Sequence, residues 1–416
     1  MLVRIPIKQL HTGMYIHEFC GSWYDHPFWR SAFLLEDPED LRDILSTSIK
    51  EVWIDTSKGV GVEGGKAEKS VASEVDDMLA QANLESREVA PHVEITPHVN
   101  ITQEAARAAK ICAQSKDAVS SMFHEARMGK ALNATDALPI VEEISISVMR
   151  NPGALISLAR LKNKDNYTYM HSVAVCALMV ALARQLGLNN DQTRQAGLAG
   201  MLHDIGKAMI PMDIINKPGR LTAAEFQTIQ NHPAKGYEIL RGSCGIGDIA
   251  LHVCLHHHEK VDGSGYPDRL TNEQINLYGK MSAVCDVYDA ITSIRAYKEG
   301  WEPALAIRKM AEWSQSHFDQ RIFEAFVRSV GIYPTGSMVR LASDRLGVVI
   351  EQTDQSLLTP KVKVFFSIKS GTRTPSEILD LSKPSCKDKI VSHEDPAKWK
   401  ISDIKELWSD ISAAPW

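Results

Sequence analysis

The run Met201-Leu-His-Asp-Ile-Gly-Lys places an imidazole and a carboxylate on consecutive residues. His203 and Asp204 stand at the end of an apolar pattern with helical spacing. Gly206 is then expected to break the helix, and Lys207 places a cation beside the pair. Adjacent His and Asp side chains can reach one shared point if that point is a metal ion, and an ion needs more than two ligands. The remaining ligands must therefore come from other segments of the chain.

Histidines cluster in the middle of the chain, where seven of the fifteen fall between residues 171 and 258. His171 shares a helical face with Val175 and Leu178, so it is expected to point inward. A single inward histidine is more often a hydrogen-bonded core residue than a ligand. His203 stands on an inward face in the same way, with Asp204 beside it. His232 precedes a proline at a break between two helices and is a weak candidate by itself.

Helical phase separates the four histidines at the end of the following helix. His252 and His256 are four residues apart and share a polar stripe, so they are expected at the surface. His257 and His258 follow Cys254 and its apolar neighbours, and we expect both to face the interior.

Two acids in a later apolar helix complete the candidates. Asp286 lies in Met281-Ser-Ala-Val-Cys-Asp-Val-Tyr-Asp-Ala-Ile, and Asp289 follows one turn later on nearly the same face. A buried carboxylate is costly unless it is paired or bound to metal. Two such acids beside a histidine cluster indicate a metal site or the residues that surround one.

Five histidines and two aspartates form the candidate ligand set: His171, His203, Asp204, His232, His257, His258 and Asp286. The set contains no thiolate, which disfavours a structural zinc site. Mixed imidazole and carboxylate ligands suit iron, manganese, zinc, nickel or cobalt. Seven ligands exceed what one ion uses and suit two ions bridged by a carboxylate. Such a pair, roughly 3.5–4 Å apart, can activate a water and stabilise an in-line displacement at phosphorus.

Two of these segments carry a family resemblance. The run 203–207 resembles the HD motif of metal-dependent phosphohydrolases, which is a moderately specific signal. The segment His257-His-Glu-Lys-Val-Asp-Gly-Ser-Gly-Tyr-Pro is far more specific. It resembles the HHExxDGxGYP signature of the HD-GYP family, which are bacterial cyclic di-GMP phosphodiesterases. The segment 286–298 is similar to that family's next block. The resemblance covers about residues 135–330, and residues 1–65 resemble a small domain often placed before HD-GYP units.

The resemblance implies a role for each matched residue. The seven candidate ligands fall on the family's metal-ligand positions, with Asp204 as the bridge between ions. Lys207 falls on a lysine near the scissile phosphate, as a general acid or charge stabiliser. The positions that hold the dinucleotide are Tyr266, Asp289, Arg295 and Lys298. Gly263 and Gly265 are expected to let the loop that carries Tyr266 fold over the metal cleft.

The resemblance implies hydrolysis of cyclic di-GMP by a metal-activated hydroxide. The expected product is linear pGpG, and a second cut to GMP is the less favoured outcome. Members with three ions carry a glutamate one helical turn before the first ligand, whereas this chain has Tyr167 there. We therefore predict two divalent ions, with iron or manganese favoured over zinc, nickel or cobalt.

Two alternatives stay open at this point. One is a catalytically weak HD-GYP unit that senses cyclic di-GMP or binds a partner protein. The other is an HD phosphohydrolase that acts on a different nucleotide.

The pattern along the 416 residues predicts a mainly α protein. We expect a small N-terminal α+β domain at 1–65, a linker at 66–100, an all-helical HD-GYP domain at 101–334, and a C-terminal β appendage with a polar tail at 335–416. Within the helical domain, Thr222 and Asp191 are expected N-caps. In the appendage, three strands are expected, at residues 337–341, 347–350 and 361–366.

Composition limits the partners and the location. The net charge is −6, which argues against a nucleic-acid polymer as ligand. Seven cysteines without paired spacing indicate a reducing compartment. The longest apolar run, residues 173–183, is too short to span a bilayer. We therefore expect a cytoplasmic protein without a membrane segment, and a homodimer or a signalling-protein partner is left open.

Overall fold

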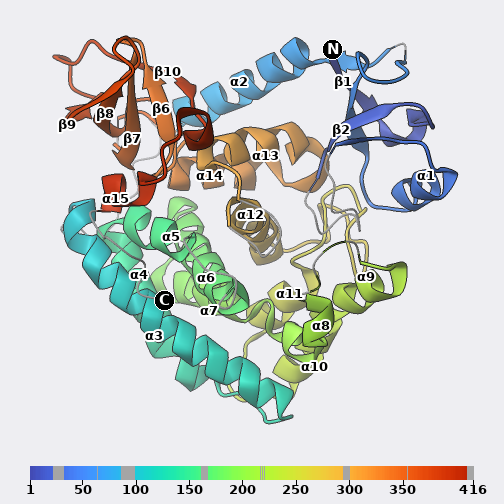
Figure 1. Ribbon diagram of the computed structural model, residues 1–416. Helices are drawn as coiled ribbons and strands as arrows, with labels where there is room; N and C mark the ends of the chain where they lie inside the picture. The colour runs from blue at the N-terminus through green and yellow to red at the C-terminus, as the bar shows by residue number, and fades with distance from the viewer. Residues whose placement is uncertain are drawn as a thin grey trace.

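Helical patterns occupy the middle of the sequence and strand patterns its two ends, and the computed structural model follows this division (Figure 1). It describes residues 1–21, 32–62, 64–85, 99–160, 167–215, 217, 219, 221–293, 300–353 and 355–409. The predicted fold class, mainly α with a small sheet-containing unit at each end, is confirmed.

The N-terminal unit is an antiparallel sheet with its own apolar core. Its elements are β1 (Leu2–Pro6), β2 (Tyr15–Phe19), β3 (Phe33–Leu34), α1 (Pro38–Leu45), β4 (Glu51–Asp55) and β5 (Lys66–Ala67). The strand order is β3-β2-β4-β1-β5, so the longest strands lie in the centre. Ile5, Ile16, Ile44 and Ile54 are completely buried between the sheet and α1.

The helix α2 (Glu68–Glu85) occupies much of the segment predicted as a linker. It runs from the N-terminal sheet to the C-terminal sheet and lies along α13 and α14 (Figure 1). At its far end, the side-chain oxygen of Asn83 accepts hydrogen bonds from Ser356 and from the backbone of Leu357. The domain boundary at residue 65 stays a prediction, because α2 contacts both small units and the helical domain.

The helical domain supplies every described candidate ligand. Its helices are α3 (Ile101–Arg127), α4 (Ala134–Arg150), α5 (Pro152–Arg160), α6 (Tyr167–Gln185), α7 (Asn190–Leu202), η3 (Ile205–Met209), α8 (Met212–Ile215), α9 (Ala223–Gln230), α10 (His232–Arg241), α11 (Asp248–His256), α12 (Leu277–Thr292), α13 (Pro303–His317) and α14 (Gln320–Val330). Among them α6 is the core helix, since fourteen consecutive residues, Met170–Ala183, are buried.

By length and composition alone, α6 could cross a membrane, and among the described residues it is the one helix that passes this test. Its apolar segment is 78% buried inside the domain, against α7, α5 and α12. This burial is what a core helix requires, so the test adds little support for a membrane span.

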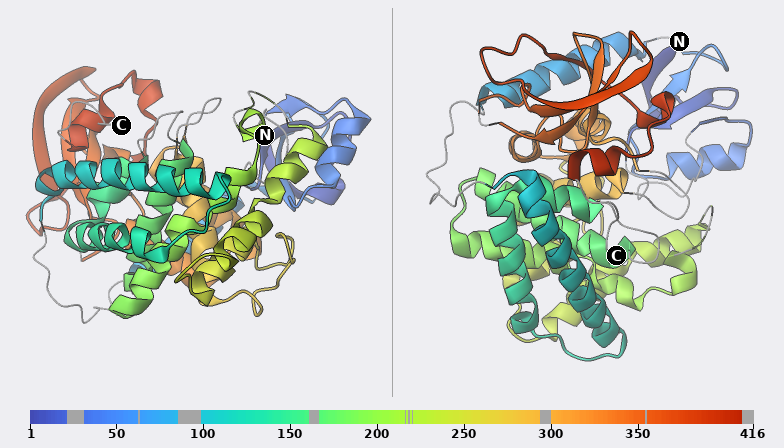
Figure 2. Two further views of the ribbon diagram at one scale, coloured as in Figure 1. Left: turned by 90° about the horizontal axis from the view of Figure 1, so that it is seen from below. Right: turned by 60° about the vertical axis from the view of Figure 1, so that its left-hand side comes forward.

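The C-terminal unit is a second antiparallel sheet, larger than predicted. Its elements are β6 (Met338–Leu341), β7 (Arg345–Glu351), β8 (Lys361–Ser367), β9 (Thr372–Asp380), β10 (Ile390–His393), η4 (Pro396–Trp399) and α15 (Ile404–Ser409). The strand order is β10-β6-β7-β8-β9. Three strands were expected, and the two that sequence missed lie at the edges. Figure 2 shows the two sheets as separate bodies, with the helical domain below them in the right-hand view.

Polar side chains join the N-terminal sheet to α13. Lys309 Nζ lies 2.7 Å from Glu18 Oε2, and the indole N–H of Trp53 donates to Glu312 Oε2 at 3.2 Å. Arg4 donates to the backbone carbonyl of Glu312. These contacts fix the N-terminal unit against the helix that borders the loop following α11.

Candidate metal centre

Five segments bring the candidate ligands together. His171 projects from the first turns of α6, and His203 and Asp204 follow the end of α7. His232 is the first residue of α10, His257 and His258 follow α11, and Asp286 lies within α12. None of the seven side chains is more than 9% exposed. The positions expected at the surface, His252 and His256, are half-buried and lie outside this cluster.

Asp204 stands between two groups of ligand atoms. Its Oδ1 lies 3.1 Å from His232 Nε2 and 3.7 Å from His257 Nε2. Its Oδ2 lies 3.4 Å from the Nε2 atoms of both His171 and His203. The ligand atoms form two main sets, His232 with His257 and His258, and His171 with His203 and Asp286. The carboxylate therefore offers one oxygen to each set.

The tautomers of the histidines leave lone pairs facing one another. Nδ1 of His203 lies 2.7 Å from the Gly200 carbonyl, and Nδ1 of His232 lies 2.7 Å from the Ile229 carbonyl. A carbonyl only accepts hydrogen bonds, so each Nδ1 carries the proton and each neutral ring has a lone pair on Nε2. His257 is oriented in the same way by two carbonyls at the end of α11.

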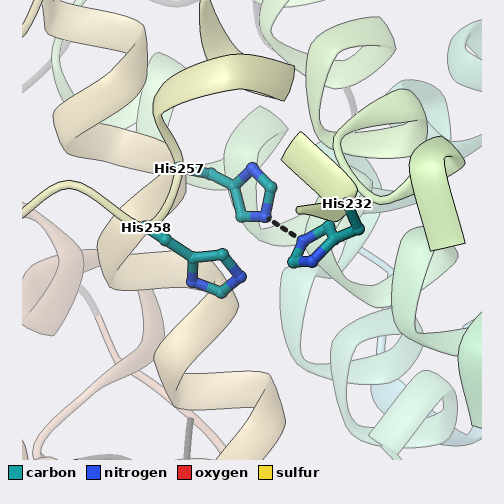
Figure 3. A group of neighbouring side chains, drawn as sticks. All are labelled: His232, His257 and His258. Atoms are coloured by element: carbon teal, nitrogen blue, oxygen red, sulfur yellow. Dashed lines mark hydrogen bonds between the residues drawn. The ribbon is translucent and has the colours of Figure 1, made fainter. Parts of the chain in front are cut away.

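One pair of Nε2 atoms then comes into contact without a donor between them. The Nε2 atoms of His232 and His257 lie 3.1 Å apart, and Figure 3 shows these two rings facing each other. Nε2 of His171 lies 3.3 Å from Nε2 of His203 and 2.9 Å from Asp286 Oδ1. Facing lone pairs repel unless a cation lies between them, so the donor set fits divalent metal ions.

Two buried carboxylate oxygens point to the same conclusion. Asp204 Oδ1 and Asp286 Oδ2 accept no hydrogen bond from any residue in the described part of the chain. A buried anionic oxygen without a donor costs several kcal/mol, roughly, unless a cation balances it. Both oxygens face the histidine cluster, which is where an ion would sit.

Asp289 lies behind the cluster and does not line an open surface. Its Oδ2 is 2.6 Å from Nδ1 of His171, and both side chains are buried. This contact fixes the tautomer of His171 and turns its Nε2 toward Asp286, 2.9 Å away. Carboxylates commonly orient metal-binding histidines in this way. The residue pattern allowed for such a role, whereas the family resemblance implied a contact with the dinucleotide.

Lys207 contacts the same oxygen of Asp204 that faces His171 and His203. Its Nζ is 2.5 Å from Asp204 Oδ2, and the residue is only 8% exposed. It lies on η3, directly after the His-Asp pair, because the chain turns from α7 into η3 at Asp204. A buried ammonium is thus held at the edge of the cluster.

Gly206 permits the closest approach of two backbones at the site. A Cβ there would lie 1.9 Å from the His232 carbonyl oxygen and 2.5 Å from the Gly236 nitrogen. The helix α7 has already ended at Leu202, so Gly206 does not break that helix as predicted. It lets η3 lie against α10, which sets the position of His232 relative to Asp204.

Gly206→Ala is therefore expected to destabilise the fold by about 2 kcal/mol or more, because α10 must move away from η3. The same shift should weaken metal retention. Chemical denaturation and metal content per chain measure the two effects. Gly242→Ala is the matched control, since its nearest neighbours would lie 3.7 Å away. Equal stability of both variants would contradict this account.

Comparison with known proteins agrees with this geometry. Residues 151–322 match the family described as HD domain, and residues 2–137 match a domain of unknown function, DUF3391. The chain is 50% identical over 413 residues to the cyclic di-GMP phosphodiesterase PA4108 of Pseudomonas aeruginosa, covering 99% of this chain and 97% of that protein. The chain belongs to the HD-GYP family.

Other similar proteins match with shorter coverage or lower identity. The cyclic di-GMP phosphodiesterase response regulator RpfG of Xanthomonas campestris is 41% identical over 148 residues, which cover 35% of this chain and 39% of RpfG. Among solved structures, Bd1817 of Bdellovibrio bacteriovorus, an HDG"Y"P protein, matches with a TM-score of 0.45 and 17% identity. The match covers 78% of this chain and 98% of Bd1817.

The HD-GYP signature loop brings Tyr266 to the cluster. Its ring stacks on the ring of His258, with centroids 4.8 Å apart. Gly265 lets the loop lie directly on the backbone of residues 258–260, where a Cβ would meet atoms at 2.4–2.6 Å. Arg295 and Lys298, also expected to hold the dinucleotide, lie outside the described residues. Tyr167 stacks on His171 at 5.8 Å, one turn away along α6.

Burial and neighbouring charge shift the pKa values of the cluster. Burial lowers the pKa of His203, and it lowers the pKa of His257 and His258 well below the ordinary value of 6.5. Burial also acts to lower the pKa of His171, but hydrogen bonds to Asp286 and Asp289 raise it overall. Burial acts to raise the pKa of Asp204, yet Lys207 and His203 hold it well below its usual range. The three histidines with a lowered pKa, His203, His257 and His258, are therefore neutral at neutral pH, as ligands must be.

The metal-free protein should lose stability on acidification. Where the folded pKa of a histidine lies below the unfolded value, the unfolded chain binds more protons below pH 6.5 and stability falls. The lowered pKa values of His203, His257 and His258 make the free energy of unfolding fall as the pH falls, whereas the raised pKa of His171 acts in the opposite direction. Each additional proton bound by the unfolded chain lowers the free energy of unfolding by about 1.4 kcal/mol for each pH unit of acidification.

Denaturation of chelator-treated protein at pH 7.0, 6.5, 6.0 and 5.5 measures this loss. The variant His258→Gln removes one of the histidines whose protonation destabilises the fold, so its free energy of unfolding should decline less steeply on acidification. A decline of equal steepness in both proteins would contradict the assignment of this pH dependence to the cluster.

Proposed function

We propose that this chain is a metal-dependent phosphodiesterase that opens cyclic di-GMP to linear pGpG. The carrying observation is the convergence of imidazole nitrogens and buried carboxylate oxygens on Asp204, beside Lys207 and Tyr266, an arrangement whose charge divalent cations would balance. The relatives at 50% and 41% identity are named as cyclic di-GMP phosphodiesterases, which supports the same substrate here.

The ligand set divides into two groups around one bridge. His171, His203 and Asp286 would hold one ion. His232, His257 and His258 would hold the other, with Asp204 shared between both. The oxygen and nitrogen donors suit iron or manganese best, with zinc, nickel or cobalt as alternatives. When bound, the two cations lower the pKa of a water nucleophile and offset charge on the phosphate.

The residues of the chain supply charge and orientation for the reaction. The oxygen of water bonds to phosphorus, the bond to the 3′ oxygen breaks, and that oxygen takes up a proton. Lys207 stabilises the charge that develops on the phosphate, or donates the proton, because its ammonium lies at the edge of the cluster beside Asp204. Asp204 therefore acts twice, as a ligand and as the partner that positions Lys207.

Substrate contacts come from the signature loop. Tyr266 lies beside the candidate ligands through its stacking on His258, and Gly265 permits the backbone path that brings it there. We assign Asp289 to the orientation of His171, given their 2.6 Å contact, and not to the dinucleotide. Arg295 and Lys298 stay predicted substrate contacts.

Two ions are proposed in preference to three. A third ion would need a carboxylate one turn before His171, and that position is Tyr167, whose ring stacks on the imidazole. A phenol cannot replace a carboxylate that bridges two cations. Without a third ion, the reaction is expected to stop at pGpG more often than to proceed to GMP.

Incubation with cyclic di-GMP and Mn²⁺ or Fe²⁺, followed by chromatography of the products, tests the proposal. The expected result is conversion to pGpG, with the variant His203→Ala inactive. Binding without conversion would instead favour a sensor or protein-interaction module. Because two relatives are named 3'3'-cGAMP-specific phosphodiesterases, the panel includes that dinucleotide, and its exclusive hydrolysis would overturn the substrate assignment. The cytoplasmic location and the homodimer or signalling partner stay predictions.

A further inference from the structure

Glu259 follows directly after the candidate ligands His257 and His258, yet it faces the other way. Its carboxylate accepts a hydrogen bond from the backbone N–H of Asp268 at 2.7 Å, on Oε1. Its Oε2 accepts from the backbone N–H of Leu270 at 3.0 Å. Glu259 is 2% exposed, so these contacts are shielded from water. Both oxygens accept from amides, and Glu259 belongs to none of the candidate ligand groups among the described residues.

The amides converge on Glu259 because the chain turns sharply after the Tyr266-Pro267 bond. Arg269, between the two donors, has φ of 57°, the left-handed conformation. Successive amide groups in such a turn point to one side and form a binding place for an anion. Here the anion is a side chain of the same segment that carries His258.

Hydrogen bonds therefore hold the signature loop, residues 259–270, at both ends. At its entry, the amides of Val261 and Asp262 donate to the carbonyls of His317 and Ser316, at the end of α13. At its exit, the amides on either side of Arg269 bind Glu259. Tyr266 lies between these anchors, with its amide donating to the His258 carbonyl at 3.3 Å and its ring on the His258 ring.

We propose that Glu259 is a positioning residue that fixes Tyr266 over the metal centre and thereby sets the affinity for substrate. This inference rests on the proposed function for its substrate. Charge-assisted hydrogen bonds to a buried carboxylate are stronger than neutral ones. Loss of the charge should loosen the exit of the loop, while the neighbouring His257 and His258 keep their own contacts.

Glu259→Gln tests this, because an amide keeps the size of the side chain but replaces one acceptor by a donor. We expect KM for cyclic di-GMP to rise about 10-fold, as for the loss of one such hydrogen bond. We expect kcat to change by less than about 3-fold and metal content to stay at the wild-type level. Glu273→Gln, an exposed change in the following turn, is the matched control.

A double-mutant cycle with Tyr266→Ala separates positioning from a general effect on stability. If Glu259 acts through Tyr266, Glu259→Gln should add little to KM once the ring is absent. Additive effects, an unchanged KM, or loss of metal from Glu259→Gln would each overturn the proposal.

Amide hydrogen exchange keeps this test independent of turnover. Exchange at residues 266–270 should become faster in Glu259→Gln and stay unchanged in Glu273→Gln. If the wild-type protein does not hydrolyse cyclic di-GMP, the proposed function fails, whereas unchanged exchange in this segment refutes the role of Glu259 alone.

Discussion

Asp204→Asn is expected to reduce kcat for cyclic di-GMP by at least ~1,000-fold, about 4 kcal/mol of activation free energy. The amide keeps the shape of the side chain but removes the negative charge that both ligand groups face, at 3.1 Å and 3.4 Å. It also removes the anion that positions Lys207. Loss of kcat should accompany loss of bound metal, and steady-state kinetics with metal analysis measures both.

Asp213→Asn is the control for this variant, because Asp213 is an exposed carboxylate in α8, close in sequence but away from the cluster. It should behave as wild type. Circular dichroism must show that both variants are folded. Near-normal turnover by folded Asp204→Asn would mean that the chemistry lies elsewhere.

Removal of metal should abolish turnover and lower the thermal stability of the wild-type protein. The reason lies in the histidine cluster, where imidazole nitrogens face one another and two carboxylate oxygens have no hydrogen-bond donor. These groups repel one another once the cations are gone. A ligand present at ~1,000 times its dissociation constant stabilises a fold by about 4 kcal/mol. Thermal denaturation and activity assays, before and after chelation, measure this contribution.

Re-addition of Mn²⁺ or Fe²⁺ should restore both properties. Asp204→Asn supplies the comparison, since its melting temperature should respond much less to chelator and to added metal. If chelation left the wild-type melting temperature and activity unchanged, the histidine cluster would be a hydrogen-bonded core and not a metal centre.

The helical domain could be predicted from sequence because its burial pattern is periodic. The sequence pattern predicts helices at residues 152–160, 167–186 and 277–293, and the bounds of α5, α6 and α12 differ from these by at most one residue at either end. Helix caps were less certain. Thr222 caps α9 as expected, but α7 is capped by Asn189 and not by Asp191. Both are good capping residues, and local sequence does not distinguish them.

The C-terminal sheet was only partly predictable, for a physical reason. The strands found from sequence are β6, β7 and β8, which lie inside the sheet and are rich in buried apolar residues. The edge strand β9 is mostly exposed and contains Pro375, so it needs no apolar face and gives no period-two signal. The other edge strand, β10, is short and mostly half-buried.

At the site, sequence predicted which side chains gather but not what each one touches. Helical phase selected His257 and His258 over His256, and the structure brings His257 to Asp204 and His258 to Asp286. The contact between Asp289 and His171 joins α12 to α6 across 118 residues, so no local pattern could predict it. The same applies to Glu259, whose neighbours in sequence are candidate ligands while its contacts lie nine and eleven residues further on.

The central claim is that imidazoles and acids from five segments hold a pair of cations around Asp204. A crystal structure of the purified protein, with anomalous data collected at the edges of iron, manganese and zinc, tests it most directly. The account predicts two anomalous peaks, one beside His171, His203 and Asp286 and one beside His232, His257 and His258, each in contact with Asp204. No peak among these residues, or a third peak beside Tyr167, would contradict it.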